Sequence, residues 1–153
     1  MKKTNKKGFT LVELVIVIAV LAILAAIAIP TVTSVINNAN KSAAASNAHQ
    51  VQAAINSYAA KVDAGLITLA SDQSLGTQTV ATALADYGTD ISALTTKGGW
   101  KLQYNAGKIA AVKNGVDTNG NTFSGTDLNT AGSDTLATVG VTGANSNNSN
   151  TNG

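Results

Sequence analysis

The sequence predicts an α+β fold, in which a long N-terminal helix kinked at Pro30 packs its outer half on a small antiparallel β-sheet. Three observations predict this arrangement. Residues 9–29 form an apolar run, a helical period continues from there to about Ala64, and polar and apolar residues alternate after Gly99. The chain has 153 residues, which is the length of one domain.

The apolar run, FTLVELVIVIAVLAILAAIAI, is long enough to cross a bilayer. As a helix it would extend for roughly 31 Å, about the thickness of a hydrocarbon core. The apolar region of an ordinary secretory signal is shorter, at about 7–15 residues. Four lysines lie among the first seven residues, so the positive-inside rule keeps the N-terminus in the cytoplasm and the remainder of the chain outside.

Glu13 is the only charged residue in this run. A carboxylate within a membrane span costs ~2.5–3.5 kcal/mol on insertion scales, so it needs a partner or a role. The chain has no Lys, Arg or His between residues 8 and 40 that could pair with it. Glu13 either lies at shallow depth near the lipid headgroups or meets a cation that the precursor does not supply in this segment.

Pro30 lacks an amide hydrogen for the carbonyl of Ala26, so it either ends the membrane helix or kinks a longer one. The apolar residues that follow favour one kinked helix from about Thr10 to Ala64, with Gly65 as its C-terminal cap. They recur at helical spacing: Val32, Ile36, Ala39, Ala43, Val51, Ile55, Tyr58 and Val62.

After Gly65 the pattern predicts a short helix over 78–87 and three strands. Trp100, Leu102 and Tyr104 alternate with polar residues in the first strand. A turn at 105–107 leads to a second strand over 108–112, and the third covers 135–141. The sheet would bury Trp100 and Tyr104 against Val51 and Ile55. Residues 142–153 are small and polar, which predicts a disordered tail.

The segment Lys6-Lys7-Gly8-Phe9-Thr10-Leu11-Val12-Glu13, with the apolar run and Pro30 behind it, resembles the class III signal of type IV pilins and related pseudopilins. The resemblance covers about 35 residues. It implies that a prepilin peptidase cuts after Gly8 and methylates the new amine of Phe9. It also implies that Glu13 is the assembly residue, which meets the amine of a neighbouring subunit.

Phe9 and Glu13 are four residues apart, so we expect them on one face of the helix. The new cation would offset the cost of burying the carboxylate. The resemblance also implies the pilin ladle fold, and it implies that the backbone near Pro30 loosens when subunits leave the membrane.

The resemblance divides the chain into five parts. Residues 1–8 are the leader, 9–29 the transmembrane and filament-core helix, and 30–64 its amphipathic continuation. Residues 65–141 are the globular head and 142–153 the polar tail. Before assembly the subunit lies in the cell membrane with its head outside, and after assembly it lies in a surface pilus.

The function that follows is that of a structural subunit of a type IV pilus, serving adhesion, motility or DNA uptake. Its partners are copies of itself in a helical filament, the prepilin peptidase, the assembly machinery and the membrane. One alternative is a pseudopilin of a type II secretion or competence system. Another is a membrane-anchored or secreted protein cut by an ordinary signal peptidase at Ala26-Ile27-Ala28. The chain has no Cys to close a C-terminal disulfide loop, which favours a Gram-positive type pilin or a pseudopilin.

Composition argues against several other classes. Beyond the leader, six lysines face eight acids and there is no Arg, so bulk charge does not favour nucleic acid. We predict no enzyme and no cofactor, because no nucleophile–base arrangement is visible; the single histidine, His49, is expected on the wet side of the helix. Asp117, Asn119 and Asn121 match positions 1, 3 and 5 of a calcium loop. Thr122 and Leu128 replace its glycine and glutamate, so we predict a turn and no metal site.

Overall fold

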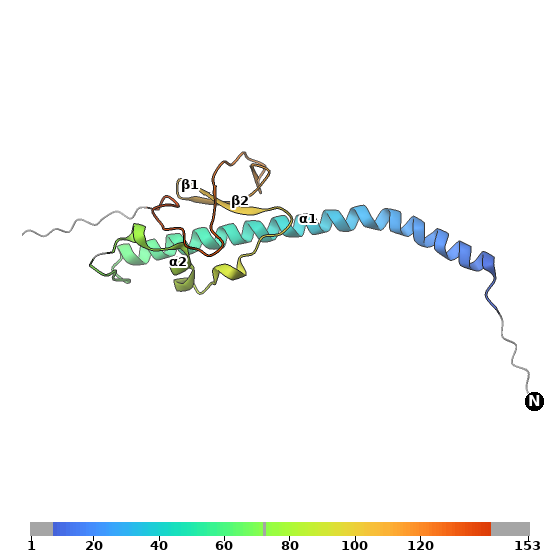
Figure 1. Cartoon of the computed structure of the whole chain (residues 1–153), viewed down its shortest axis with the longest axis horizontal. Coiled ribbons are helices and arrows are strands. Elements are labelled where there is room, and N and C mark those ends of the chain that lie inside the picture. Colours follow the sequence, from blue (N-terminus) through green and yellow to red (C-terminus); the bar gives the residue numbers. More distant parts are fainter. Residues whose placement is uncertain (1–7, 72, 142–153) are drawn as a thin grey trace, which may run out of the picture. The chain divides into compact units, whose positions relative to one another are not determined.

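The computed structural model describes residues 8–71 and 73–141 and has the predicted α+β fold. The two α-helices are α1 (Leu11–Asp63) and α2 (Val80–Asp86), and short 3₁₀ helices cover Leu75–Thr77 and Ile91–Ala93 (Figure 1). The strands are β1 (Lys101–Asn105), β2 (Lys108–Lys113), β3 (Val116–Asp117) and β4 (Thr126–Asp127). The chain forms two compact units, of which the first ends at Asn38 and the second begins at Ala39.

Helix α1 continues without a break through Pro30. The hydroxyl of Thr31 donates to the carbonyl of Ala28 at 2.8 Å, and that of Thr33 donates to the carbonyl of Ile29 at 3.0 Å. These hydroxyls bond carbonyls of the preceding turn other than that of Ala26, whose usual N–H donor the proline removes. The prediction of one long helix is confirmed, and the kink at Pro30 stays a prediction.

The end of α1 is a Schellman motif built on the predicted cap, Gly65. Its φ of 72° is in the left-handed region, which glycine adopts without strain. The N–H of Gly65 donates to the carbonyl of Val62, and the N–H of Leu66 donates to that of Lys61. These bonds satisfy carbonyls that the last turn leaves open.

Within the second unit, α1 buries one narrow stripe of mostly small side chains. The predicted stripe began at Val32, but burial begins only at Ala44, and Val32, Ile36 and Ala43 are exposed. The stripe keeps a helical spacing, so α1 presents one face to the core. Its members are Ala44, Ala48, Val51, Ala54, Ile55 and Tyr58.

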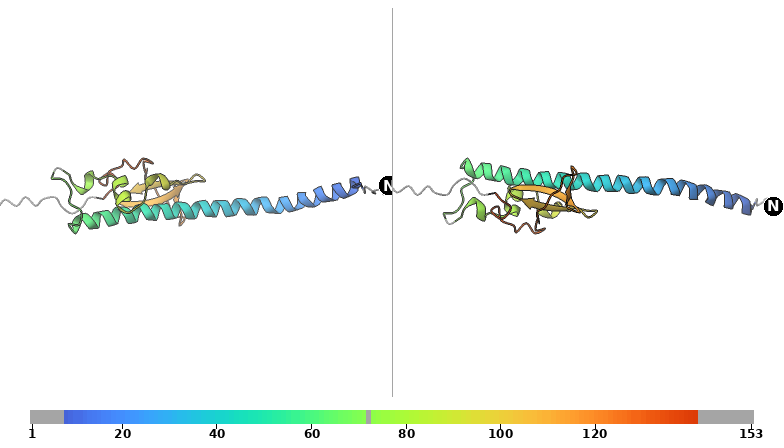
Figure 2. Two further views of the ribbon diagram at one scale, coloured as in Figure 1. Left: turned by 90° about the horizontal axis from the view of Figure 1, so that it is seen from below. Right: turned by 90° about the horizontal axis from the view of Figure 1, so that it is seen from above.

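The four strands form one antiparallel sheet in the order β3-β2-β1-β4. In the views of Figure 2, β1 and β2 extend along the part of α1 that belongs to the second unit. Tyr104 of β1 pairs with Ile109 of β2, and both join one buried cluster with Val51 and Ile55. Trp100 is half-buried and packs against this cluster, so the predicted burial is confirmed for Tyr104 and only partial for Trp100.

Both hairpin turns have two central residues with positive φ. The β1–β2 turn uses Ala106 (48°) and Gly107 (80°), and the β2–β3 turn uses Asn114 (53°) and Gly115 (76°). Positive φ at both positions is the requirement of a type I′ turn, which matches the twist of the strands it joins. The Asn114-Gly115 pair is a strong hairpin signal in the sequence, and it marks a strand, β3, that we did not predict.

The prediction of a strand over residues 135–141 is wrong. Only Thr135 makes an isolated bridge, to Thr79, and the chain then turns on itself. The N–H of Val139 donates to the carbonyl of Thr135, and the N–H of Val141 donates to the carbonyl of Leu136. Leu136 and Val139 are three residues apart and both have 0% exposure, so they share one side of a turn rather than one face of a strand.

Candidate processing and assembly site

The N-terminus of α1 is closed by a capping box between Thr10 and Glu13. The backbone N–H and the hydroxyl of Thr10 donate to Oε2 of Glu13 at 2.9 and 2.7 Å. In return, the N–H of Glu13 donates to the hydroxyl oxygen of Thr10 at 3.3 Å. The pair satisfies N–H groups that the first turn of a helix cannot satisfy itself.

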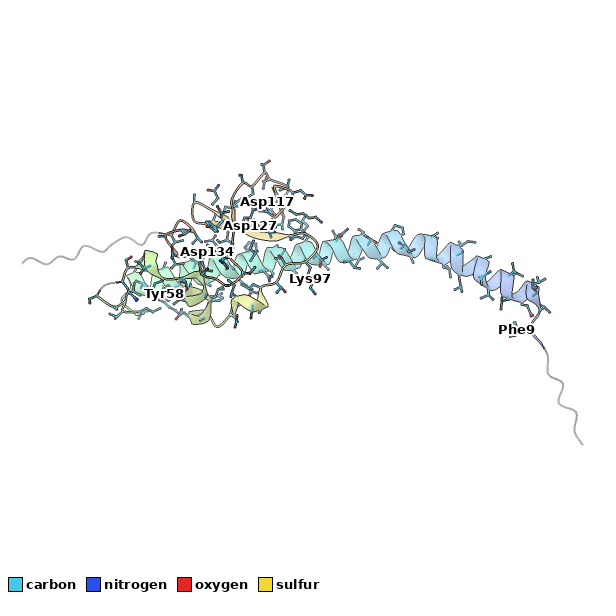
Figure 3. The ribbon with its side chains drawn as sticks, in the orientation of Figure 1. Phe9, Tyr58, Lys97, Asp117, Asp127 and Asp134 are labelled. Carbon is cyan, nitrogen blue, oxygen red and sulfur yellow. The ribbon has the colours of Figure 1, made fainter. Side chains whose placement is uncertain are left out.

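The residues before the cap lie outside the helix. Phe9 precedes the cap residue and is 83% exposed, and Gly8 is exposed with open space where a side chain would begin. Our expectation that Phe9 and Glu13 share a helix face is therefore wrong for this chain, because the capping box starts the helix after Thr10. The bond between Gly8 and Phe9 lies in exposed, non-helical backbone. Figure 3 labels Phe9 at this end of the chain, before α1.

Beyond the cap, α1 presents apolar side chains on all sides. The segment is long and apolar enough to cross a membrane, and none of its most apolar stretch is buried within the described residues. A helix that is apolar all round is typical of a membrane span or of a position inside an assembly. Its large exposed side chains are Leu11, Val12, Leu14, Val15, Ile16, Val17, Ile18, Val20, Leu21, Ile23, Leu24, Ile27 and Ile29.

Comparison with known families addresses this same segment. A family model described as the prokaryotic N-terminal methylation motif matches residues 3–29. The chain carries this methylation motif. The motif is the class III signal of type IV pilins and pseudopilins, so it supports a pilin-like or pseudopilin-like protein. No curated protein and no solved structure gives a match to the chain.

The methylation motif includes Gly8, Phe9, Thr10 and Glu13 and ends just before Pro30. It implies processing by a prepilin peptidase and handling by an assembly machinery. Together with the apolar helix it indicates membrane anchoring before assembly. It points to a structural pilin-type protein rather than to an enzyme.

Thr10 is the residue of this site that our sequence analysis missed. We treated Glu13 as an acid without a partner in its own chain, whereas its carboxylate accepts two hydrogen bonds from Thr10. The spacing Thr-x-x-Glu directly before an apolar run is the signature of a capping box, and it was available in the sequence.

The loop with calcium-like spacing uses its acid internally. Oδ1 of Asp117 accepts hydrogen bonds from the backbone N–H groups of Asn119 and Asn121 at 2.8 and 2.9 Å. These bonds, with the one from Asn121 first, lower the pKa of the Asp117 carboxyl below its usual value. A carboxylate held in this way closes a turn, as the departures at Thr122 and Leu128 suggest. The absence of a calcium site stays a prediction.

Proposed function

We propose that this chain is the structural subunit of an extracellular type IV pilus. The prepilin peptidase removes residues 1–8 and methylates Phe9, and the mature subunit waits in the membrane with its head outside. Subunits then leave the membrane and pack their apolar N-terminal helices together in a helical filament. Glu13 receives the amine of a neighbouring Phe9 and thereby sets the position of one subunit against the next.

The observation that carries this proposal is the geometry of the Glu13 carboxylate. Both hydrogen bonds from Thr10 end on Oε2. Oε1 accepts no hydrogen bond from any described residue, although the carboxylate is the only charge of a 21-residue apolar run. One oxygen therefore holds the helix start while the other is open to a cation from outside the chain.

The exposed helix supports the same conclusion. In a bilayer its apolar side chains are covered by lipid, and in a filament they would be covered by the helices of other subunits. The apolar side chains are away from water both in the bilayer and in the filament, so the transfer from one to the other does not require a large loss of hydrophobic stabilisation. A soluble monomer with this surface would aggregate.

The methylation motif supports a pseudopilin of a secretion or competence system equally well. The two differ in what the subunit builds, since a pilus is a long surface filament in which this chain would be the main protein. Imaging sheared surface filaments and identifying their main protein distinguishes them. Filaments made mainly of another protein would favour the pseudopilin alternative.

The processing step is tested by mass spectrometry of the mature N-terminus. We expect a chain that begins with N-methylated Phe9. A chain that begins at Ile29 would indicate cleavage after Ala28 by an ordinary signal peptidase and would overturn the proposal. Gly8→Val should leave full-length precursor in the membrane, because the resemblance implies a small residue before the cut. Gly8→Ala is the matched control and should be processed.

A further inference from the structure

Three lysines gather at the end of the second unit where its part of α1 begins. We call Lys41, Lys97 and Lys113 the basic end. Lys41 lies on α1, Lys97 belongs to the turn that leads into β1, and Lys113 is the last residue of β2. Lys41 and Lys97 are exposed, and Lys113 is half-buried.

Two glycines bring these three segments together. A β-carbon at Gly98 would lie 2.8 Å from Nδ2 of Asn40, the neighbour of Lys41 on α1. A β-carbon at Gly99 would lie 3.5 Å from Cε of Lys113. The turn at residues 97–99 therefore lies directly against α1 on one side and against the Lys113 side chain on the other.

None of the three lysines forms an ion pair with a described residue. The ion pairs within the described residues join other lysines, namely Lys61 to Asp86 at 2.7 Å and Lys101 to Asp127 at 2.6 Å. The two acids of the sheet have other partners, because Asp127 pairs with Lys101 and Asp117 accepts bonds from its own loop. In Figure 3, Lys97 is seen apart from the labelled Asp117 and Asp127. The basic end thus carries three cations that form no ion pair with a described carboxylate.

We propose that the basic end binds anionic lipid headgroups while the subunit is stored in the membrane. The inference rests on the proposed function, since it needs the apolar helix to be inserted. Lys41 lies twelve residue steps after Ile29, so the tether is ~18 Å as helix and at most ~40 Å when extended. This tether holds the basic end at high local concentration near the headgroups. Each lysine at an anionic surface increases the bound population about fivefold.

The only tryptophan of the chain provides the probe. Trp100 follows Gly99 and is half-buried at the basic end. The full mature chain, from Phe9 on, is reconstituted in nanodiscs of phosphatidylcholine alone or mixed with phosphatidylglycerol. Both lipid mixtures contain a phosphatidylcholine with a spin label on its headgroup, which quenches nearby tryptophan emission. Co-elution of chain and nanodisc is checked first.

We expect strong quenching with phosphatidylglycerol, weak quenching without it, and loss of the difference at high salt. Replacing all three lysines of the basic end by Gln should reduce the population bound to the phosphatidylglycerol headgroups more than tenfold. Lys61→Gln is the control, because it removes one cation on the same helix about 30 Å from Lys41.

Equal quenching in both lipids, or an unchanged response of the triple variant, would overturn the inference while leaving the proposed function intact. A chain that fails to enter the nanodiscs would contradict the membrane-stored state, and with it both proposals. Trp100 emission that responds to added duplex DNA but not to phosphatidylglycerol would assign the basic end to nucleic acid and overturn the lipid partner.

Discussion

Gln52 of α1 binds the backbone of Ile109 at the start of β2. The N–H of Ile109 donates to Oε1 of Gln52 at 2.7 Å, and Nε2 of Gln52 donates to the carbonyl of Gly107 at 3.0 Å. The Gln52 side chain thereby supplies the hydrogen-bond partners of two backbone groups at the hairpin turn, as a neighbouring strand would do. It fixes the β1–β2 hairpin on the helix at a defined position along α1.

Removing this side chain should destabilise the head. We expect Gln52→Ala to cost about 1–3 kcal/mol, because a partly buried N–H and a carbonyl lose their partners. Urea unfolding of the mature chain in detergent, followed by Trp100 fluorescence, measures it. Gln50→Ala is the matched control, since Gln50 is half-buried two residues earlier and makes no hydrogen bond with a described residue. Equal effects of the two changes would show that the contact with Ile109 is not stabilising.

The two hairpin turns differ at their first central residue. Ala106 is exposed and has a φ of 48°, a conformation that asparagine tolerates better than alanine. We expect Ala106→Asn to stabilise the head by about 0.5–1 kcal/mol. The reverse change at the second turn, Asn114→Ala, should destabilise it by a similar amount. The same unfolding experiment applies, and a loss of stability in Ala106→Asn would contradict the type I′ assignment.

Gly140 lies against the first hairpin turn. A β-carbon there would overlap the backbone nitrogen of Gly107 and lie 2.9 Å from the carbonyl carbon of Ala106. Gly140 and Gly88 both have positive φ, 90° and 80°, but Gly88 has open space around it. Gly88→Ala should therefore cost only the backbone strain, ~1–2 kcal/mol. Gly140→Ala should cost about 1–3 kcal/mol more, because the overlap adds to the strain. Similar midpoints for the two variants would show that residues 136–141 do not pack on the turn.

The lowered pKa of Asp117 predicts an acid-sensitive loop. Because its folded pKa lies below the unfolded value of about 3.9, the stabilisation is complete above that value and is lost as pH falls through the folded pKa. Melting temperatures measured from neutral pH downward should fall less steeply at acid pH in Asp117→Asn than in the wild type. The remaining slope has other sources, since hydrogen bonds also lower the pKa of Asp90 and Asp127. An unchanged dependence of the melting temperature on acid pH in Asp117→Asn would argue against the loop structure. Asp63→Asn, at an exposed acid, is the control.

Sequence patterns predicted the elements that have a sustained period. The run from Leu11 to Asp63 is long enough for helical spacing to be visible, and β1 alternates over five residues. Strands β3 and β4 have two residues each, which is too short for any period, and they exist only through pairing with β2 and β1. The strand predicted over 135–141 does not form, and Leu136 and Val139 are instead both buried on one side of a turn.

The candidate site was predicted in part for a similar reason. A single carboxylate in an apolar run is conspicuous, so the sequence alone singles out Glu13 as a candidate, and its role in assembly stays a prediction. Its engagement by Thr10 depends on where the helix begins, and helix starts are the least certain feature of a sequence prediction. The tertiary contact of Gln52 has no local signature, because its partners lie 55 and 57 residues away along the chain.

The filament yield of Glu13→Gln tests whether Glu13 attracts the amine of a neighbouring subunit. Glutamine at this position can still form the capping box with Thr10, so the helix start is kept and only the negative charge is removed. The variant should be inserted, cleaved after Gly8 and retained in the membrane as mature subunit. We expect few or no sheared filaments when every subunit carries the change, and partial recovery when wild-type subunits are mixed in. Filaments at wild-type yield from Glu13→Gln alone would show that the carboxylate only caps its own helix and does not attract a neighbouring amine.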